Sequence, residues 1–433
     1  MTTYETAVTV LGLLLVGGAL LSGLARRSIL SLTAVFVLLG VALGDGGAGV
    51  LDFDPRSGFV EGLALTALVL ILFRDGLEVE AEMLQKAWRP PLRKLVLAMP
   101  ITAGIIAVAT HALTDLSWTQ AFLLGALLSP TDPVLSSSVV TNPRVPRIVR
   151  HSLNLESGLN DGLALAPVLA LVAALGADSD FVWWRFVLQD VTLGVLYGIA
   201  VGLLASVVLP RGETIAAHQR ALAALGVAFV AYGATTLPPH GNGVIAVFVC
   251  AITLGIRRPD VRHTFEERSD DVIEIAKLGV FVVFGSLLTL DGLFTDGWAA
   301  VAIVLVTLVL ARTVAVMAAL AGTGLDTATK GFMAFFGPKG VATMTFSLLV
   351  LNAEVPGGER IFNLAALVVL CSIVLHGLSD TPGSEWIARR ASANAARPAP
   401  ARPGTPTSIA YDAPGGSGSA SAAAGAGPPD GQA

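Results

Sequence analysis

The sequence predicts an all-α protein that crosses a membrane about thirteen times. Apolar residues make up 54% of the 433 residues, charged residues only 14%, and the mean hydropathy is +0.74. A soluble domain has a similar apolar share but about a quarter charged residues, so the missing charge is the informative anomaly. Two further observations support membrane spans: the spacing of apolar runs and the distribution of Lys and Arg between the loops.

Long apolar runs recur along the chain until residue 378. A bilayer core about 30 Å thick needs roughly 20 helical residues, and shorter runs suffice where neighbouring helices help. The second, third and ninth runs are short, which leaves the count uncertain by one. The first run lacks the basic start and the small-residue cleavage site of a signal peptide. The thirteen runs are residues 4–24, 29–43, 59–73, 95–113, 118–140, 155–175, 186–209, 221–237, 241–256, 272–290, 298–320, 331–351 and 361–378.

Lys and Arg are concentrated in every second loop. Loops after odd-numbered runs hold nineteen of them, including Arg74 and Lys94, whereas loops after even-numbered runs hold three, Arg56, Arg185 and Arg360. Because basic residues concentrate in cytoplasmic loops, this asymmetry predicts an outer N-terminus and a cytoplasmic C-terminus in a cell membrane.

Composition also excludes some functions and sets apart the end of the chain. A net charge of −5 argues against a nucleic-acid partner, which needs a basic surface. Cys250 and Cys371 each lie in an apolar run, so we expect no disulfide, structural metal or other cofactor. Residues 381–433 become rich in Ala, Pro, Gly and Ser, which predicts a disordered cytoplasmic tail, either an inert linker or a regulatory segment.

The fifth run, AFLLGALLSPTDPVLSSSVV, places Asp132 between Pro130 and Pro133. A proline has no amide hydrogen, so the carbonyls of Ala126 and Ser129 lose their helical donors and the helix must break. Broken helices at the centre of a bilayer expose carbonyls that can coordinate a cation. The alternative is a simple kink in which Asp132 only caps the restarted helix.

The sixth run carries two polar stripes in NLESGLNDGLALAPVLA. Glu156 and Asn160 are four residues apart and share one helix face, while Ser157 and Asp161 share another. Ser157 and Asp161 can meet Asp132 and supply hard oxygen ligands that suit a small alkali cation. The alternative is a solvated helix start.

Basic residues inside the runs need partners. Lys339 lies within FFGPKGVATMTFSLLV, and we expect Glu156 to pair with it. Lys277 is close enough to the cytoplasmic end for its side chain to reach water. Arg312 lies deeper, and two interpretations stay open for it: a structural ion pair or a place in the cytoplasmic funnel.

The motifs SPTDP, ESGLNDG and FGPKG, in this order, resemble the NhaP-like branch of the monovalent cation:proton antiporters, the sodium/hydrogen exchanger family. LILFRDGL and HGNGVIAVFVCAITLG extend the resemblance over residues 4–379. The resemblance implies two inverted repeats of six helices, with two crossing broken helices as in the NhaA-like fold. It also implies a transmembrane exchanger domain at residues 1–380, made of a core and a dimerisation part, and a homodimer.

The resemblance assigns roles residue by residue. Asp132 matches the ion-binding aspartate of the unwound helix, and Thr131 contributes its backbone carbonyl. Asp161 matches the second binding aspartate, which also carries the proton, and Ser157 matches a side-chain ligand.

Supporting positions follow from the same motifs. Asn160 matches the asparagine of the ND pair, and Glu156 matches the glutamate that pairs with a basic residue late in the chain. Asp75 falls in the third-run motif and, with Arg312, is assigned to the cytoplasmic funnel.

Two departures from the family pattern stand out. The late basic position is usually arginine, in GxRG, but here it is Lys339. The third-run motif, often FEGG, reads Phe73, Arg74, Asp75, Gly76. Asn160 predicts electroneutral exchange, whereas a lysine at the late position accompanies electrogenic relatives.

Together these patterns predict a secondary transporter, not an enzyme, that exchanges Na⁺, with K⁺ or Li⁺ as alternatives, for protons by competition at Asp132 and Asp161. A passive cation channel would instead show flux uncoupled from a pH gradient. An intramembrane aspartyl protease also needs two aspartates, but the sequence has no GxGD segment.

Overall fold

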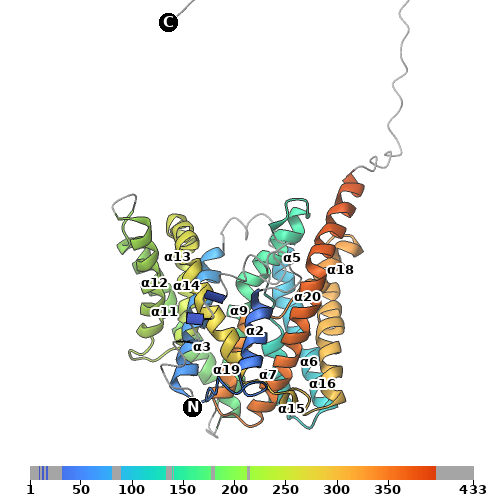
Figure 1. The fold of residues 1–433 in the computed structure, drawn as a ribbon. Coiled ribbons are helices and arrows are strands. Elements are labelled where there is room, and N and C mark those ends of the chain that lie inside the picture. The colour runs from blue at the N-terminus through green and yellow to red at the C-terminus, as the bar shows by residue number, and fades with distance from the viewer. Residues whose placement is uncertain are drawn as a thin grey trace, which may run out of the picture. The chain divides into compact units, whose positions relative to one another are not determined.

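A computed structural model describes residues 32–79, 89–132, 141–176, 181–211 and 215–395, together with residues 9, 12, 13, 16, 17 and 139. Throughout these ranges the regular elements are helices (Figure 1). The predicted all-α class is therefore confirmed. The first predicted span, residues 4–24, lies almost wholly outside the described residues.

Three long helices contain a π-helical turn: α5, η1 and α6 run on from one another, as do α10, η3 and α11, and α16, η4 and α17. Such turns shift the side chains that follow them and often mark functional positions. The elements are α2 (Leu32–Leu43), α3 (Gly58–Glu78), α5 (Arg89–Arg93), η1 (Lys94–Ala98), α6 (Met99–Leu113), α7 (Trp118–Leu128), α9 (Arg147–Leu175), α10 (Trp183–Phe186), η3 (Val187–Val191), α11 (Thr192–Val208), α12 (Ala217–Ala234), α13 (Gly243–Arg257), α14 (Pro259–Ser286), α15 (Leu290–Leu293), α16 (Trp298–Leu305), η4 (Val306–Ala311), α17 (Arg312–Ala319), α18 (Thr327–Phe335), α19 (Val341–Asn352) and α20 (Gly358–Ala395).

The predicted spans from the second onward each coincide with one to three of these consecutive helical elements. Two of them are interrupted. The fifth span forms α7 and stops at Leu128, before Pro130, and the twelfth is divided into α18 and α19 around Pro338. Several basic residues that were assigned to loops lie in helices instead, among them Arg74 inside α3 and Lys94 at the start of η1.

The predicted start of the disordered tail at residue 381 was also wrong. Helix α20 continues to Ala395. Its extension buries Ile387, which is 1% exposed, and stacks the ring of Trp386 on Phe332 of α18 with 6.2 Å between centroids. Packing against α18 therefore orders residues that the composition alone assigns to the tail. Residues 396–433 lie outside the described part.

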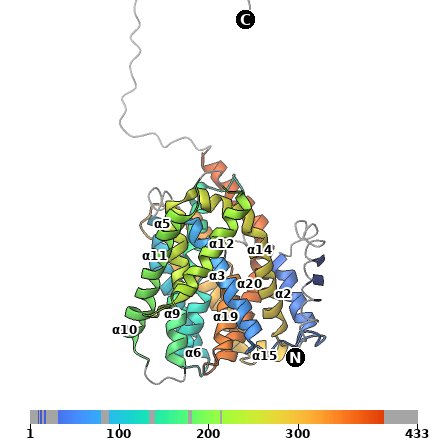
Figure 2. The ribbon, with the colours of Figure 1, turned by 90° about the vertical axis from the view of Figure 1, so that its left-hand side faces the viewer.

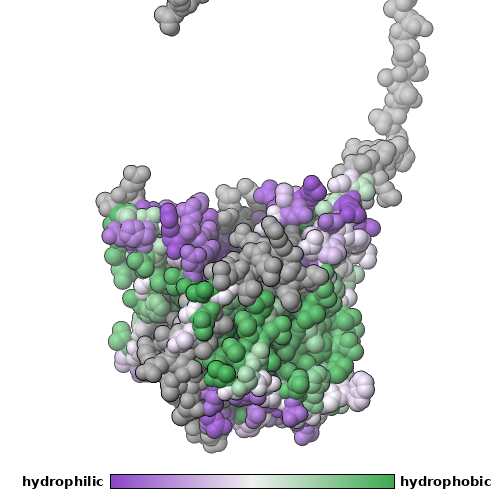
Figure 3. Space-filling model, viewed as in Figure 1, coloured by the Kyte–Doolittle hydropathy of each residue, from purple (hydrophilic) through white to green (hydrophobic). Residues whose placement is uncertain are grey.

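The surface carries an apolar belt. Figure 3 shows hydrophobic side chains across the middle of the molecule, with hydrophilic surface above and below. Large apolar side chains such as Val207, Phe229 and Leu305 are 68%, 44% and 58% exposed. A soluble protein rarely exposes so large a continuous apolar area, so the belt is the surface that faces lipid.

The helices pack as two groups (Figures 1 and 2). We call α5 to α9 and α16 to α20 the site bundle, and α2, α3 and α11 to α14 the companion bundle. Within the companion bundle α13 packs closely on α11 and α3, and α14 packs on α2. Helix α3 also contacts α9 and α19, so it joins the two bundles beside the broken helices.

Candidate functional site

The break after α7 follows from its prolines. Pro130 has no hydrogen to donate to the carbonyl of Ala126, and the Ser129 hydroxyl donates to that oxygen instead, at 3.0 Å. The carbonyl of Ser129, whose helical donor would be Pro133, accepts from the ammonium of Lys339 at 3.4 Å. Both carbonyls that the sequence left without donors thus have new partners.

The break between α18 and α19 depends on two glycines. A Cβ at Gly337 would overlap the guanidinium of Arg312, and a Cβ at Gly340 would overlap the carboxylate of Asp132. Each glycine therefore allows a charged side chain to approach the backbone where the helix is unwound. Pro338 between them prevents the helix from continuing.

The two breaks bind each other reciprocally. The backbone N–H of Asp132 donates to the carbonyl of Pro338 at 2.8 Å, and the N–H of Val341, the first residue of α19, donates to Asp132 Oδ2 at 3.2 Å. In return, Lys339 Nζ donates to the Pro130 carbonyl at 3.1 Å. A carboxylate thus faces a helix N-terminus and an ammonium faces a helix C-terminus, which is the favourable sense for both helix dipoles.

Asp132 consequently does act as a helix cap, for α19. The residues that follow it, 133–138, are outside the described part. Capping uses Oδ2, and the carboxylate is partly accessible.

Helix α9 places a second polar group against the first break. The side-chain amide of Asn160 donates to the Thr131 carbonyl at 2.7 Å and to the Thr131 hydroxyl at 3.1 Å. Asn160 and Asp161 are 2% and 5% exposed, and Oδ1 of each accepts no hydrogen bond from the described residues. Ser157 is half-buried one turn before Asp161. Buried polar atoms normally have partners, so two such oxygens on consecutive residues of α9 indicate a binding position.

The predicted pairing of Glu156 with Lys339 is wrong. Arg312 of α17 donates to both carboxylate oxygens of Glu156, at 2.9 and 3.2 Å, and the ammonium of Lys94 forms a further ion pair with Oε2. Lys339 instead donates to the carbonyls at the end of α7. The planar guanidinium fits a carboxylate with two parallel bonds, which a lysine cannot match.

Sequence reasoning did not find that Lys94 belongs to this cluster. It ends a basic stretch, RPPLRK, that looks like an ordinary cytoplasmic flank. In the structure Lys94 is 1% exposed and also reaches the carbonyl of Ser152 at 3.4 Å. Of the two interpretations of Arg312, the structural ion pair is the one observed.

A small cavity of about 170 Å³ leads toward Asp132 from the predicted cytoplasmic face. Its lining includes Arg74, Asp270, Lys277 and Val341, whose amide holds Asp132. Arg74 Nε lies 3.4 Å from Asp270 and 3.3 Å from Glu78. Asp75 is the residue after Arg74 on α3. Asp75 and Asp132 both interact electrostatically with Asp161.

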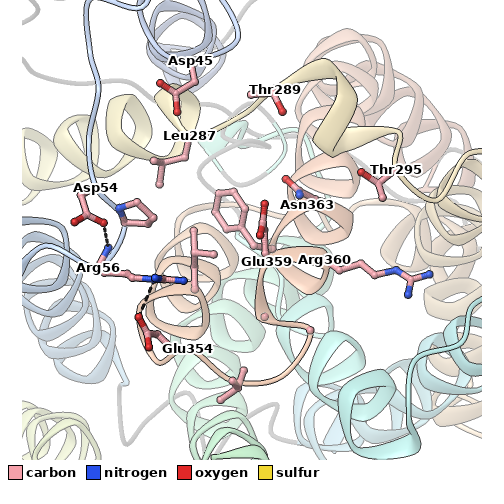
Figure 4. Close-up of a pocket in the computed structure, with 16 residues that line it drawn as sticks. Asp45, Asp54, Arg56, Leu287, Thr289, Thr295, Glu354, Glu359, Arg360 and Asn363 are labelled. Carbon is pink, nitrogen blue, oxygen red and sulfur yellow. Dashed lines mark hydrogen bonds and ion pairs between the residues drawn. The ribbon is translucent and has the colours of Figure 1, made fainter. Parts of the chain in front are cut away.

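Two larger cavities open on the opposite face. One, of about 600 Å³, lies among α3, α9, α12, α13 and α19 and reaches Leu165, one turn beyond Asp161. The other, of about 930 Å³, is shown in Figure 4 and is lined by acidic side chains and two arginines. In it Arg56 pairs with Glu354 at 2.8 Å, whereas Arg360 points away from the centre. This cavity contains none of the predicted site residues.

Comparison with known proteins agrees with this geometry. Residues 12–386 match the profile of the family described as sodium/hydrogen exchanger, transmembrane. The chain belongs to the sodium/hydrogen exchanger family. It is accordingly a multi-pass membrane protein of a transporter family rather than an enzyme, and the predicted family resemblance is confirmed.

Curated relatives include transporters named for either cation. The K(+)/H(+) antiporter NhaP2 of Shewanella oneidensis is 27% identical over 368 residues, 84% of this chain and 63% of its own length. The K(+)/H(+) antiporter NhaP of Alkalimonas amylolytica is 27% identical over 89% of this chain and 68% of its own. The Na(+)/H(+) antiporter NhaG of Bacillus atrophaeus is 28% identical over 76% of this chain and 66% of its own. This chain thus spans less than two thirds of the Shewanella protein.

The fold is shared with a solved structure. The sodium proton antiporter MjNhaP1 of Methanocaldococcus jannaschii superposes with a TM-score of 0.76 over 89% of this chain and 98% of its own, at 20% identity. The predicted antiporter fold with broken helices is therefore confirmed.

Proposed function

We propose that the chain exchanges a monovalent cation for protons, and that both bind at Asp161 beside the crossing of the two broken helices. The observation that carries the proposal is the pair of buried oxygens, Oδ1 of Asn160 and Oδ1 of Asp161, that accept no hydrogen bond among the described residues. The side-chain amide of Asn160 also holds Thr131 by two hydrogen bonds.

The chemistry of the donors suits an alkali cation. Carboxylate, amide and carbonyl oxygens are hard ligands, and no soft sulfur or imidazole stands among these residues. Asp161 supplies the charge, Asp132 the second carboxylate through the oxygen that does not cap α19, and Thr131 its carbonyl. Ser157, one turn before Asp161, supplies a hydroxyl.

Exchange follows from competition for the same oxygens. Two nearby carboxylates with little water cannot both stay charged at low cost, so the site takes up either a cation or a proton. A loaded site crosses between the two faces, whereas an empty charged one is held back by its desolvation cost. The small cavity that ends at Val341 and the larger one that reaches Leu165 are the two approaches.

Further assignments belong to the same proposal. Asn160, in the position where electrogenic relatives carry an aspartate, favours electroneutral exchange. Na⁺ is the first candidate ion, with K⁺ and Li⁺ as alternatives. The curated relatives include transporters named for K⁺ and for Na⁺. We also propose a homodimer in the cell membrane with the N-terminus outside, consistent with the asymmetry of basic loops.

The test is ion-specific transport by the purified protein in liposomes that contain a pH-sensitive dye. Adding Na⁺, K⁺ or Li⁺ should dissipate an imposed pH gradient with at least one ion. If exchange is electroneutral, the rate will not change when valinomycin and K⁺ set a membrane potential. A cation flux that persists without a proton counterflow would overturn the proposal in favour of a channel.

A further inference from the structure

The unwound residues between α18 and α19 are also held from α20. Ser372 and His376 lie one turn apart on that helix and are 0% and 2% exposed. The backbone N–H of Lys339 donates to the hydroxyl of Ser372 at 2.8 Å. His376 Nε2 lies 3.0 Å from the carbonyl of Phe335, the last residue of α18. Two adjacent side chains of α20 therefore contact the chain on both sides of the break.

Both ring nitrogens of His376 face carbonyl oxygens, Nε2 that of Phe335 at 3.0 Å and Nδ1 that of Ser372 at 2.9 Å. Because a carbonyl only accepts, a neutral imidazole donates to one of the two. In the form with the hydrogen on Nε2, His376 donates to Phe335, and the Ser372 hydroxyl, 3.2 Å from Nδ1, donates to that nitrogen while accepting from Lys339. The chain of bonds runs from Lys339 through Ser372 and His376 to Phe335.

From α17, a charged side chain also binds the backbone near the break. Arg312 of α17 donates to the carbonyls of Met333 and Phe336 at 3.3 and 3.4 Å. Arg312 and Lys339 are the charged groups that act on His376 from the elements packed against it. Side chains of α17 and α20 therefore bind backbone groups of the break that would otherwise lack partners in a buried unwound segment.

Burial of Ser372 and His376 costs free energy that simple packing would not require. An apolar pair would pack in a membrane helix without the cost of burying a hydroxyl and an imidazole. Polar side chains inside membrane helices are usually kept for function. Here the polar atoms all serve the break that carries Lys339 and meets Asp132.

We propose that His376, acting through Ser372, is a positioning residue for cation exchange. The pair fixes the break so that Lys339 reaches the end of α7 and the N-terminus of α19 meets Asp132. This inference rests on the proposed exchange function. It assigns a role to α20, which contributes none of the predicted ligands.

Substitutions at His376 separate positioning from packing. His376→Leu removes both bonds, whereas a glutamine can donate to Phe335 and accept from Ser372. Displacing a group by about 1 Å can cost up to about 100-fold, and loss of a supporting partner typically costs 10–100-fold in affinity. We expect His376→Leu to raise the cation KM at least about 10-fold, with a smaller fall in maximal rate. His376→Gln should stay within about 3-fold of wild type.

Two controls complete the liposome experiment. His111→Leu removes a histidine that contacts the carbonyl of Leu116 at the far end of α6, and should leave the KM unchanged. Ser372→Ala is the second variant if His376→Leu does not fold. An unchanged KM in folded His376→Leu, or in folded Ser372→Ala in its place, would overturn the inference. Failure of His376→Gln to restore a raised KM would also contradict it.

Amide hydrogen exchange of residues 336–341 tests the same bonds without transport. His376→Leu should exchange these amides faster than wild type, while His111→Leu should not. Unaltered protection would contradict the inference even if the wild type proved not to exchange cations. Absence of exchange in the wild type, by contrast, would count against the proposed function alone.

Discussion

Two clusters of charge in the molecule use the same chemistry at different depths. On the predicted outer face, Arg360 at the start of α20 donates to Asp296 at 2.9 and 3.0 Å and also pairs with Asp115. At the crossing, Glu156 is paired with Arg312 and Lys94. The side chain of Asp115 is 85% exposed, whereas that of Glu156 is 7% exposed.

The difference in depth changes what each cluster does. The exposed pair of Arg360 with Asp115 is screened by water and salt and is worth about 0–1 kcal/mol, although Asp296 in the same cluster is only 6% exposed. A buried group costs several kcal/mol to desolvate, and removing one partner leaves an uncompensated charge. Charge at the crossing is therefore expensive to keep, as expected if it serves the exchange that we propose.

The largest effect is expected from Asp161→Asn. The substitution removes the charge that the cation or proton neutralises, so exchange should fall at least about 100-fold, in the range set by loss of a group that acts in every cycle. Dye dequenching in liposomes measures it. Asp115→Asn, an exposed aspartate changed in the same way, is the matched control and should exchange normally. Activity of Asp161→Asn within 3-fold of wild type would remove Asp161 from the site.

Glu156→Gln should cause the next largest change, in stability as well as transport. The substitution leaves the buried charges of Arg312 and Lys94 without their carboxylate, which should lower the free energy of unfolding by about 3–5 kcal/mol. The expected result is a marked fall in the thermal midpoint of the detergent-solubilised protein. Arg258, a buried cation bound to carbonyls at the end of α11 in the companion bundle, supplies a comparison. Arg258→Gln should lower the midpoint but leave the cation KM unchanged.

Lys339→Met should disturb the crossing more selectively. The variant loses both bonds to the Ser129 and Pro130 carbonyls but keeps the Glu156 cluster. We expect a cation KM raised about 10-fold, as for other lost supporting contacts, with a smaller fall in stability than for Glu156→Gln. Lys339→Leu, of similar size and equally uncharged, should behave like Lys339→Met. Wild-type kinetics in both would show that the ammonium does not order the breaks.

The smallest effect is expected from Asp115→Asn on stability. The hydrogen bond from Arg360 holds the pKa of Asp115 below its ordinary value of 3.8. A lowered folded pKa means that the stabilisation is present above the unfolded pKa and is lost as the pH falls through the folded one. The difference in thermal midpoint between wild type and Asp115→Asn should therefore be small near pH 7 and vanish once the pH falls below the lowered pKa of Asp115. It should also shrink in high salt, and a difference that grows with acid would contradict the assignment.

The buried and exposed clusters also show where sequence reasoning succeeds. Proline chemistry predicted the break at Asp132, and that signal is local. Helix periodicity separated the face of Glu156 and Asn160 from that of Ser157 and Asp161, but it assigned the second face to the break, whereas the structure shows Asn160 bonded to Thr131. The partner of Glu156 is not a local property, because Lys94, Lys339 and Arg312 are distant in sequence and any of them satisfies a charge rule.

Other errors have the same origin. Lys94 looked like a loop residue because the π-helical turn that begins with it leaves no pattern in the sequence. The end of α20 looked like a tail because its contact with Phe332 is tertiary. His376 was visible as a polar residue in an apolar run, yet only the structure shows that both sides of the neighbouring break lie within its reach.

The central claim is that a cation and a proton compete for Asp161, and proton release on cation binding tests it most directly. Purified protein in weakly buffered detergent solution is titrated with Na⁺ or K⁺ while the pH is recorded. The wild type should release close to one proton per bound cation at a pH where the site is protonated, and Asp161→Asn should release none. Saturable cation binding without proton release, or unchanged release from Asp161→Asn, would contradict the shared site.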